Sequence, residues 1–392
     1  MRKRLFSPLA SSLLLSPLAF AQGGAPLETS LEFEAVTVIA PLMDDSSEIE
    51  SEPVLGEYSL SGLSEKVLEN GVRLRARGAL RLQADHPDRV GGTGAFGTDP
   101  FAPVGAFSGL SSAASSTGSD LRGRWETAYF QVDGGYGELR IGKDQGVAAR
   151  FHEGAKSVLS HARLDSTLLD PSGLATVRTR HDLTGPSAKI SYASPRLLGI
   201  RAGATFTPKA DADGLDRRPS AGTGGTAPET ENAIELALNA TRRLRESGWR
   251  FDVGLGWSSA DAQTLGIGDF YDSVETWSAG TRIEKDDWTF GASYLDSDNG
   301  RALGAYQAWS AGLHKEAYDT DFSIEFGRSE DDGAALESQS WRLGAARDFG
   351  PSSRLAVAYL HDETDAPLQN WETHGVVVEI TLFQEILQVT GN

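Results

Sequence analysis

Apolar and polar residues alternate along the second half of the chain with the period of two that a half-exposed β-strand requires. Phe251, Val253, Leu255 and Trp257 alternate with small or acidic residues, and the run around Ile324 repeats the pattern. The alternation predicts strands over Ser187–Ala193, Gly199–Thr207, Glu231–Arg243, Trp249–Ser259, Val274–Glu284, Trp288–Leu295, Ala305–Lys315, Asp321–Arg328, Gln339–Asp348, Arg354–His361 and Thr373–Phe383.

The connections between these strands alternate in length. Short turns separate the two members of a pair, whereas longer acidic or glycine-rich loops, such as 208–230, 260–273 and 362–372, separate one pair from the next. Tryptophans lie near the strand ends. Short turns on one rim, long loops on the other and girdles of aromatic residues are typical of barrels in an outer membrane.

An earlier strand, Val72–Leu82, carries a file of basic residues. Arg73, Arg75, Arg77 and Arg81 share one face, and apolar or small residues occupy the other. Each arginine would cost about 2–4 kcal/mol against lipid at midplane depth, so we expect the file to line a water-filled lumen. The alternative is the solvated basic face of a soluble sheet.

The stretch 124–143 predicts a hairpin, with strands Trp125–Val132 and Tyr136–Gly142 around Asp133-Gly134-Gly135. Ala128-Tyr129, Gly134, Gly137, Leu139, Ile141 and Gly142-Lys143 resemble the A-Y-x-G-L-x-G-x-F-G-x-L-x-L-G-R hairpin of Gram-negative general porins. The sequence departs from that pattern at Gln131, Tyr136 and Lys143, where the family usually has Gly, Phe and Arg.

The resemblance implies an all-β fold, a transmembrane antiparallel up-and-down β-barrel of 14–16 strands in the cell outer membrane. Such a barrel has short periplasmic turns, long extracellular loops and a constriction loop folded inward, here 145–183. It contacts outer-membrane lipid, assembles as a homotrimer and passes small hydrophilic solutes and ions. An extra hairpin is possible in 83–120 or near Ala35.

A constriction of this kind sets basic and acidic side chains against each other. We expect Arg73, Arg75, Arg77, Arg81 and Lys143 on one wall, with Glu153, Asp165 and Asp170 opposite them on the loop. Opposed charges across a narrow wet gap orient dipolar solutes and discriminate between ions. The sequence leaves the sign of the ion preference open.

The two ends of the chain predict separate segments. Residues 1–21 have the basic start, short apolar run and Ala19-Phe20-Ala21 site of a signal peptide. The acidic segment 22–71 is expected to be a periplasmic extension, poorly ordered or with a short helix or strand, before a barrel over 72–383. Residues 384–392 form a tail after Phe383, where such barrels usually end.

Composition narrows the function further. The net charge of −19 makes nucleic acid an unfavourable partner, and the chain has no cysteine. No H-E-x-x-H, G-x-S-x-G or Walker motif is present, and the seven histidines show no metal-ligand spacing. We therefore expect passive diffusion, without enzymatic activity, metal or cofactor. The alternatives are a substrate-selective channel and a barrel with an enzymatic or structural role.

Overall fold

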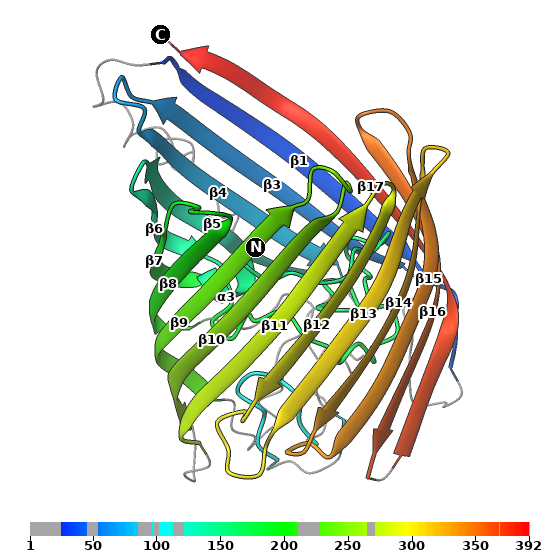
Figure 1. Ribbon diagram of the computed structural model, residues 1–392. Coiled ribbons are helices and arrows are strands. Elements are labelled where there is room, and N and C mark those ends of the chain that lie inside the picture. The colour runs from blue at the N-terminus through cyan, green and yellow to red at the C-terminus, as the bar shows by residue number, and fades with distance from the viewer. Residues whose placement is uncertain are drawn as a thin grey trace, which may run out of the picture.

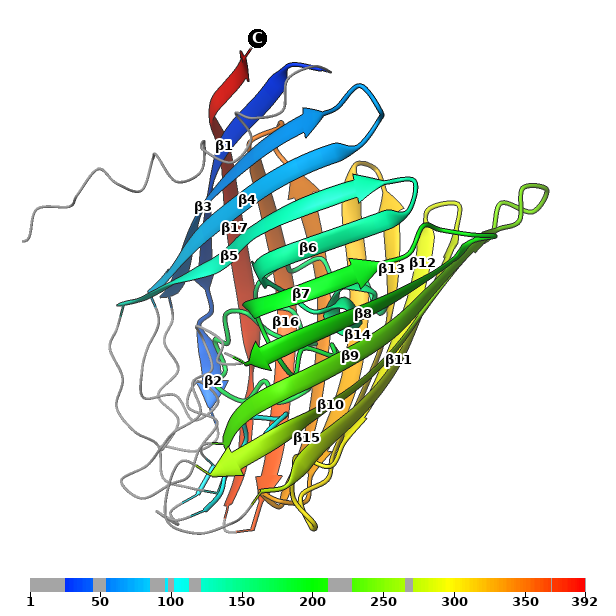
Figure 2. The ribbon, with the colours of Figure 1, turned by 90° about the vertical axis from the view of Figure 1, so that its left-hand side faces the viewer.

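The chain forms a closed β-barrel crossed by a long loop inside it (Figures 1 and 2). The computed structural model describes residues 25–44, 54–84, 96–97, 102–112, 121–210, 228–264, 271–367 and 369–391. The strands are β1 (Leu27–Ile39), β2 (Leu42–Asp44), β3 (Val54–Val67), β4 (Arg73–Ala84), β5 (Leu121–Gly134), β6 (Gly137–Asp144), β7 (Ser187–Ala193), β8 (Ile200–Lys209), β9 (Pro228–Arg243), β10 (Arg250–Thr264), β11 (Ser273–Lys285), β12 (Trp288–Ser297), β13 (Tyr306–Ala317), β14 (Thr320–Asp331), β15 (Leu336–Asp348), β16 (Ser353–Ala366) and β17 (Gln369–Gly391).

Sixteen strands close the barrel, and the predicted fold class is confirmed. From β3 to β17, each strand pairs antiparallel with the next in sequence, β1 pairs with β3, and β17 returns to close the barrel against β1. The short β2 is the extra strand and pairs with the start of β17 beside β1. Closure leaves no long free sheet edge, which a barrel needs within a lipid bilayer.

Exposed apolar side chains project outward around the barrel. Ile190 of β7, Ile324 of β14 and Val357 of β16 are each between 41% and 52% exposed, and their sequence neighbours on the inner face are buried. The alternation therefore has the apolar-out, polar-in phase of a transmembrane barrel. Among the described residues, no helix is long and apolar enough to cross a membrane.

The predicted boundary at residue 72 is wrong. Residues 27–39 and 54–67, assigned from sequence to a periplasmic extension, are the barrel strands β1 and β3. The acidic residues of β1, Glu28, Glu32 and Glu34, alternate with outward residues and occupy the inner face. Acidity therefore marked a polar lumen rather than a segment outside the barrel.

The predicted tail is also part of the barrel wall. Residues 384–391 continue β17 and pair with the start of β1, with an irregularity in register beside Leu31 and Glu32. The pairing of β16 with β17 stops at Ser353 and Leu382, whereas β1 begins at Leu27 opposite Gly391, so β17 extends past Phe383 to pair with the start of β1. The predicted signal peptide, 1–21, lies outside the described residues.

A long loop connects β6 to β7 and lies inside the barrel, as expected for the constriction loop (Figure 1). We call residues 145–186 the inward loop. It holds the one described helix, α3 (Val147–Arg150), and the rest of it is irregular. Val147 and Phe151 pack on Ala193 and Ala237, so the start of the loop is fixed to the wall at β7 and β9.

Candidate functional site: the lumen and its inward loop

The wall formed by β3, β4 and β5 is charged. Glu65 of β3 forms ion pairs with Arg75 and with Arg73, the latter at 3.1 Å. Arg81 of β4 lies 3.0 Å from both Glu57 of β3 and Glu126 of β5. Glu65 lies directly opposite Arg75 in the strand register, and Arg81 is diagonal to Glu57, so acidic and basic groups alternate around this part of the wall.

The predicted arginine file faces the lumen. Arg73, Arg75, Arg77 and Arg81 share a face of β4 with Gln83, whose amide donates to the carbonyl oxygen of Leu168 in the inward loop. Arg77 is exposed, and within the described residues it has no ion-pair partner. It therefore presents the least compensated charge of the file.

Lys143 does not belong to this set. In β6 the residues Glu138 and Arg140 face the lumen, where Glu138 pairs with Arg150 of the inward loop. Lys143 shares the opposite face with Leu139 and Ile141, which are 39% and 50% exposed. The prediction that Lys143 lines the gap is therefore wrong, because the strand alternates and Lys143 is one residue out of phase.

The wall from β10 to β15 is lined with small residues instead. A Cβ atom on Gly280 would overlap the carbonyl oxygen of Glu153, and one on Gly291 would overlap the backbone at Gly154 and Ala155. We call this inner surface, where glycines meet the inward loop, the glycine groove; it comprises Gly254, Gly280, Gly291, Gly312, Gly327 and Gly344. Glycine permits this close backbone approach because it has no side chain.

Hydrogen bonds fix the middle of the inward loop to the last strand. The buried carboxylate of Glu379 in β17 accepts from the backbone N–H groups of Ser160, His161 and Ala162 at 2.8–3.0 Å. On the other side, Nε2 of His161 lies 3.0 Å from Glu57 Oε1. The loop thus bridges β17 and β3 across the barrel seam.

Further polar contacts hold the second half of the loop. His181 binds the hydroxyls of Ser278 and Ser258 through its two ring nitrogens, at 2.9 and 2.7 Å. Asp362 of β16 forms a bidentate pair with Arg342 at 2.7 and 2.8 Å and accepts from Ser172 of the loop at 2.6 Å. The side chains of Arg342 and Asp362 are 2% and 0% exposed, so this pair is buried between wall and loop.

Two of the predicted acidic gap residues point into this packing. Asp165 accepts from the N–H and hydroxyl of Thr179, and Asp170 accepts from the N–H groups of Gly173 and Ala175, both at 2.9 Å. Both aspartates are less than 5% exposed. They shape the loop, so the expected opposition of a basic wall and an acidic loop does not hold for them.

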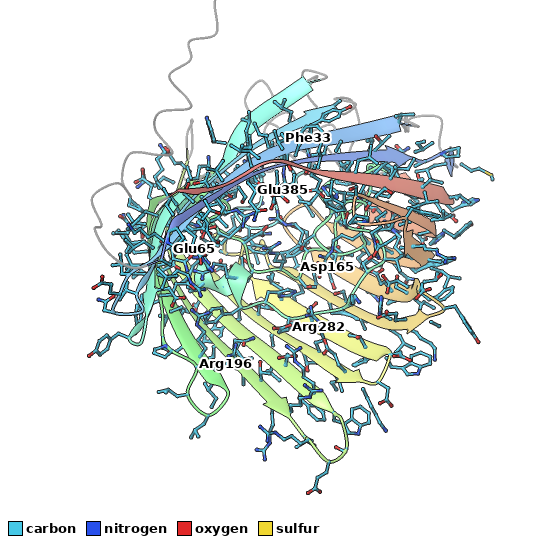
Figure 3. The ribbon with its side chains drawn as sticks, turned by 90° about the horizontal axis from the view of Figure 1, so that it is seen from above. Phe33, Glu65, Asp165, Arg196, Arg282 and Glu385 are labelled. Carbon is cyan, nitrogen blue, oxygen red and sulfur yellow. The ribbon has the colours of Figure 1, made fainter. Side chains whose placement is uncertain are left out.

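Glu153, the third predicted acid, is held by the far wall. Its carboxylate lies 3.3 Å from Arg282 of β11 and accepts from Asn239 of β9 at 3.1 Å. Figure 3 shows Asp165 and Arg282 within the ring of strands, seen from above. On the side of β5, Arg180 of the loop interacts electrostatically with Asp182, Arg163 and Asp165 of the loop itself and with Glu126 of β5. Sequence reasoning missed these two arginines because loop residues have no periodicity to fix their direction.

Protonation differs along the loop. Burial lowers the pKa of His152 to about 4 and the pKa of His181 to about 3, so both are neutral near pH 7. Burial acts in the same direction on His161, but the hydrogen bond and charge of Glu57 outweigh it and raise the pKa of His161 above its ordinary value. The bridge to β3 therefore favours the charged form of its imidazole, whereas the contacts to β10 and β11 use a neutral one.

The comparisons with known proteins agree on one family. The model of the family described as Gram-negative porin matches residues 55–367. No curated protein matches the chain.

Solved structures share the fold at low sequence identity. OprB of Pseudomonas putida is 10% identical, with a TM-score of 0.59 over 92% of this chain and 94% of that one. OmpF of Salmonella typhi, in a complex with daunomycin, is 11% identical, with a TM-score of 0.58 over 92% and 98%. OmpT of Vibrio cholerae, in its trimer form, is 12% identical, with a TM-score of 0.52 over 92% and 100%.

Proposed function

This chain belongs to the Gram-negative porin family, an outer-membrane channel family, and from that premise we propose that it is a general channel for passive diffusion of small hydrophilic solutes and ions. The observation that carries the proposal is the division of the lumen. The inward loop is fixed to β9–β17 and to β3, and it touches β4 at Gln83 and β6 at Glu138. Between these contacts the charged wall of β4–β6 faces it. The path for solutes then runs between the loop and that wall.

The lining of this path suits hydrophilic solutes. Arg77 on the wall and Arg163 and Arg180 on the loop are basic, with Glu126 and Glu138 between them. Charged groups at close quarters hold ordered water and favour solutes that can replace its hydrogen bonds. Apolar solutes of similar size cannot make that replacement and pass less readily.

A planar-bilayer measurement tests the proposal. The purified full-length protein should insert in discrete conductance steps whose size scales with the conductivity of the salt. Absence of steps from protein that retains its barrel, shown by far-ultraviolet circular dichroism, contradicts the proposal.

In a salt gradient, replacing Arg73, Arg75 and Arg77 together by glutamine should shift the reversal potential toward cations.

Substrate selection is the first alternative. A selective sugar channel would present aromatic rings along its path, because rings stack on the flat faces of sugars. The rings of Phe107, Phe151 and Tyr306 are 3%, 6% and 0% exposed and pack against the loops. Tyr129 of β5, opposite Arg77, is a partly exposed ring on the charged wall, and the guanidinium of Arg140 covers its face at 4.7 Å. Block of the ion conductance by a sugar, saturating at a defined affinity, would favour a selective channel. Solute uptake that rises linearly with solute concentration favours the general channel.

Catalysis is the second alternative, and one group of residues favours it. Ser160 Oγ lies 2.8 Å from His161 Nδ1, whose Nε2 faces Glu57 at 3.0 Å, in the order of a nucleophile, a base and an acid. However, Ser160 Oγ also donates to Glu379 at 2.6 Å, and Glu57 raises the pKa of His161. The hydroxyl proton of Ser160 is thus directed at Glu379 and not at the imidazole, so we propose an anchoring role. Hydrolysis of activated esters that Ser160→Ala abolishes would overturn that assignment.

We further propose a homotrimer. The support is the family together with the trimer form of the Vibrio cholerae OmpT structure. Light scattering of the protein in mild detergent, corrected for bound detergent, should give three times the chain mass. A mass equal to one chain in detergents that preserve the barrel would contradict this assembly.

A further inference from the structure

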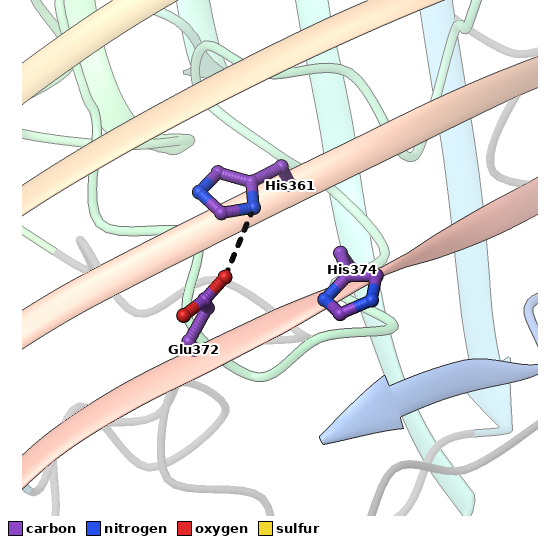
Figure 4. A group of neighbouring side chains, drawn as sticks. All are labelled: His361, Glu372 and His374. Carbon is purple, nitrogen blue, oxygen red and sulfur yellow. Dashed lines mark ion pairs between the residues drawn. The ribbon is translucent and has the colours of Figure 1, made fainter. Parts of the chain in front are cut away.

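Two histidines and a glutamate meet on the outer face of the barrel, where β16 and β17 approach the long-loop rim. His361 of β16 lies directly opposite His374 of β17 in the strand register. Glu372 precedes His374 by two residues and therefore projects from the same face. Figure 4 shows the three side chains converging, with Nδ1 of His361 3.6 Å from Oε1 of Glu372.

We propose that His361, Glu372 and His374 bind a divalent transition-metal ion of the zinc class. One ligand atom from each residue lies within 4.8 Å of the other two. Zinc binds imidazole nitrogen and carboxylate oxygen at about 2.0–2.2 Å, which places neighbouring ligands of a tetrahedron roughly 3.3–3.6 Å apart. The Nδ1–Oε1 distance already falls near this range, and small side-chain rotations bring in His374.

The donor set determines which ions suit the site. Imidazole nitrogens favour zinc, copper and nickel over magnesium and calcium, which prefer sites built entirely from oxygen. Two histidines and one glutamate supply three ligands and leave a fourth position for water. The carboxylate of Glu372 is 41% exposed, which leaves it free to turn toward an ion.

Aromatic neighbours hold the first histidine in place. The ring of Trp341 stacks on His361, with centroids 5.7 Å apart and an interplanar angle of 28°. Tyr359 stacks on the same tryptophan at 5.2 Å and lies 6.4 Å from His374. Surroundings that fix the orientation of a ligand ring raise metal affinity, because less freedom is lost when the ion binds.

Electrostatics at this position also favour a cation. Glu363 of β16 lies directly opposite Glu372, and Glu337 of β15 is opposite Asp365. Like charges on directly opposed strand positions destabilise a sheet. A divalent ion at Glu372 would offset part of this repulsion. His361 lies directly opposite Trp341 and two residues beyond Tyr359, and Glu372 lies further toward the long loops.

Sequence inspection does not reveal this group because its members come from two strands. Glu372 and His374 have the i, i+2 spacing that shares a strand face, but a pair alone is common. The antiparallel register adds His361, thirteen residues before His374. The group lies on the outer face, separate from the lumen, so the proposal does not depend on channel function.

Zinc titration of the detergent-solubilised full-length protein tests the site. Isothermal calorimetry should give one saturable site per chain, and Co²⁺ should give the intense visible absorption of a site with nitrogen ligands and low coordination number. His361→Ala and His374→Ala should each weaken binding at least about 10-fold, and Glu372→Gln should weaken it less. Zinc should also raise the melting temperature of the wild-type barrel.

Two control variants separate this site from adventitious binding. Glu330→Gln removes an exposed acid near the same rim on β14, and His314→Gln removes a histidine that faces the lumen. Both should bind zinc as the wild type does. No saturable site in the wild type, unchanged affinity in His374→Ala, or equal losses in the controls and the site variants would each overturn the proposal. Barrel content by circular dichroism shows that each variant is folded.

Discussion

The walls of the lumen formed by β3–β6 and by β10–β15 have the same β-barrel backbone but carry different kinds of inward-facing side chain. On β3–β6, long charged residues face water and pair with one another, as Arg75 does with Glu65. On β10–β15, glycines and serines face inward, and the backbone of the inward loop lies against them. The first wall can be altered at little structural cost, whereas the second behaves as a protein interior, where packing and buried polar groups decide stability.

Asp362→Asn should have the largest effect, because it breaks the buried pair under the loop. The change leaves Arg342 charged without a carboxylate, and removing one partner of a buried pair costs about 3–5 kcal/mol. We expect a lower unfolding midpoint in urea, measured by far-ultraviolet circular dichroism. Arg328→Gln is the control, because its pair with Glu337 is half exposed and exposed pairs contribute about 0–1 kcal/mol. Equal midpoints for the two variants would mean that the loop side is not packed as an interior.

Gly280→Ala should displace the inward loop. The added Cβ overlaps a backbone carbonyl of the loop, and overpacking of this kind typically costs about 1–3 kcal/mol. The added methyl pushes the loop away from β11 and toward the charged wall, which narrows the path, so single-channel conductance should fall. Gly135→Ala is the matched control, because a Cβ there meets nothing within 4 Å. Unchanged conductance in Gly280→Ala, with the barrel intact, would show that the groove does not hold the loop.

Acid should weaken the loop contacts at His181. Its pKa is lowered from about 6.5 to about 3, so the released loop takes up a proton that the packed loop excludes. This stabilisation is present above pH 6.5 and is lost as the pH falls toward 3, by about 2 kcal/mol at pH 5. The noise of the single-channel current should therefore increase on acidification. His181→Asn should reduce that pH dependence and leave the part due to His152, whose pKa is about 4.

The contact at His161 has the opposite sign. Because its pKa is raised, its stabilisation is complete below pH 6.5 and is lost as the pH rises through the raised value. His161→Gln should therefore leave the acid-induced noise in place and change the behaviour at alkaline pH. If the noise of the single-channel current rises at alkaline pH in His181→Asn but not in His161→Gln, the two histidines hold the loop independently and with opposite pH dependence.

The sequence predicted what periodicity encodes and missed what long-range packing decides. The inward direction of Arg73–Arg81 follows from alternation, and register confirms it. The directions of Asp165 and Asp170 do not, because partners far along the chain fix the loop: Ser160 binds Glu379, 219 residues away. The strand β1 was missed for a third reason. Its acidic residues are hidden from lipid only once the barrel closes, so its composition alone resembles a loop.

Removing a single charge from the wall of β3–β6 should have the smallest effect of these changes. The ion selectivity should nevertheless differ clearly between variants of two neighbouring arginines. Arg77 is exposed and has no ion-pair partner among the described residues, whereas Arg75 is paired with Glu65. A unit charge about 7 Å from a permeating ion contributes about 0.6 kcal/mol in water, or roughly a threefold change in permeability ratio. We expect Arg77→Gln to shift the reversal potential toward cations in a salt gradient.

Arg75→Gln should give a smaller shift, because Glu65 keeps Arg73 as a partner at 3.1 Å and its charge stays partly compensated. Both shifts should shrink in concentrated salt, where screening shortens the reach of each charge. Neither variant should alter the free energy of unfolding by more than about 1 kcal/mol, since Arg77 is exposed and the pair of Arg75 with Glu65 is partly open to water. A shift for Arg75→Gln equal to that for Arg77→Gln would mean that ions sense the summed charge of the wall, so that pairing does not decide what each arginine contributes.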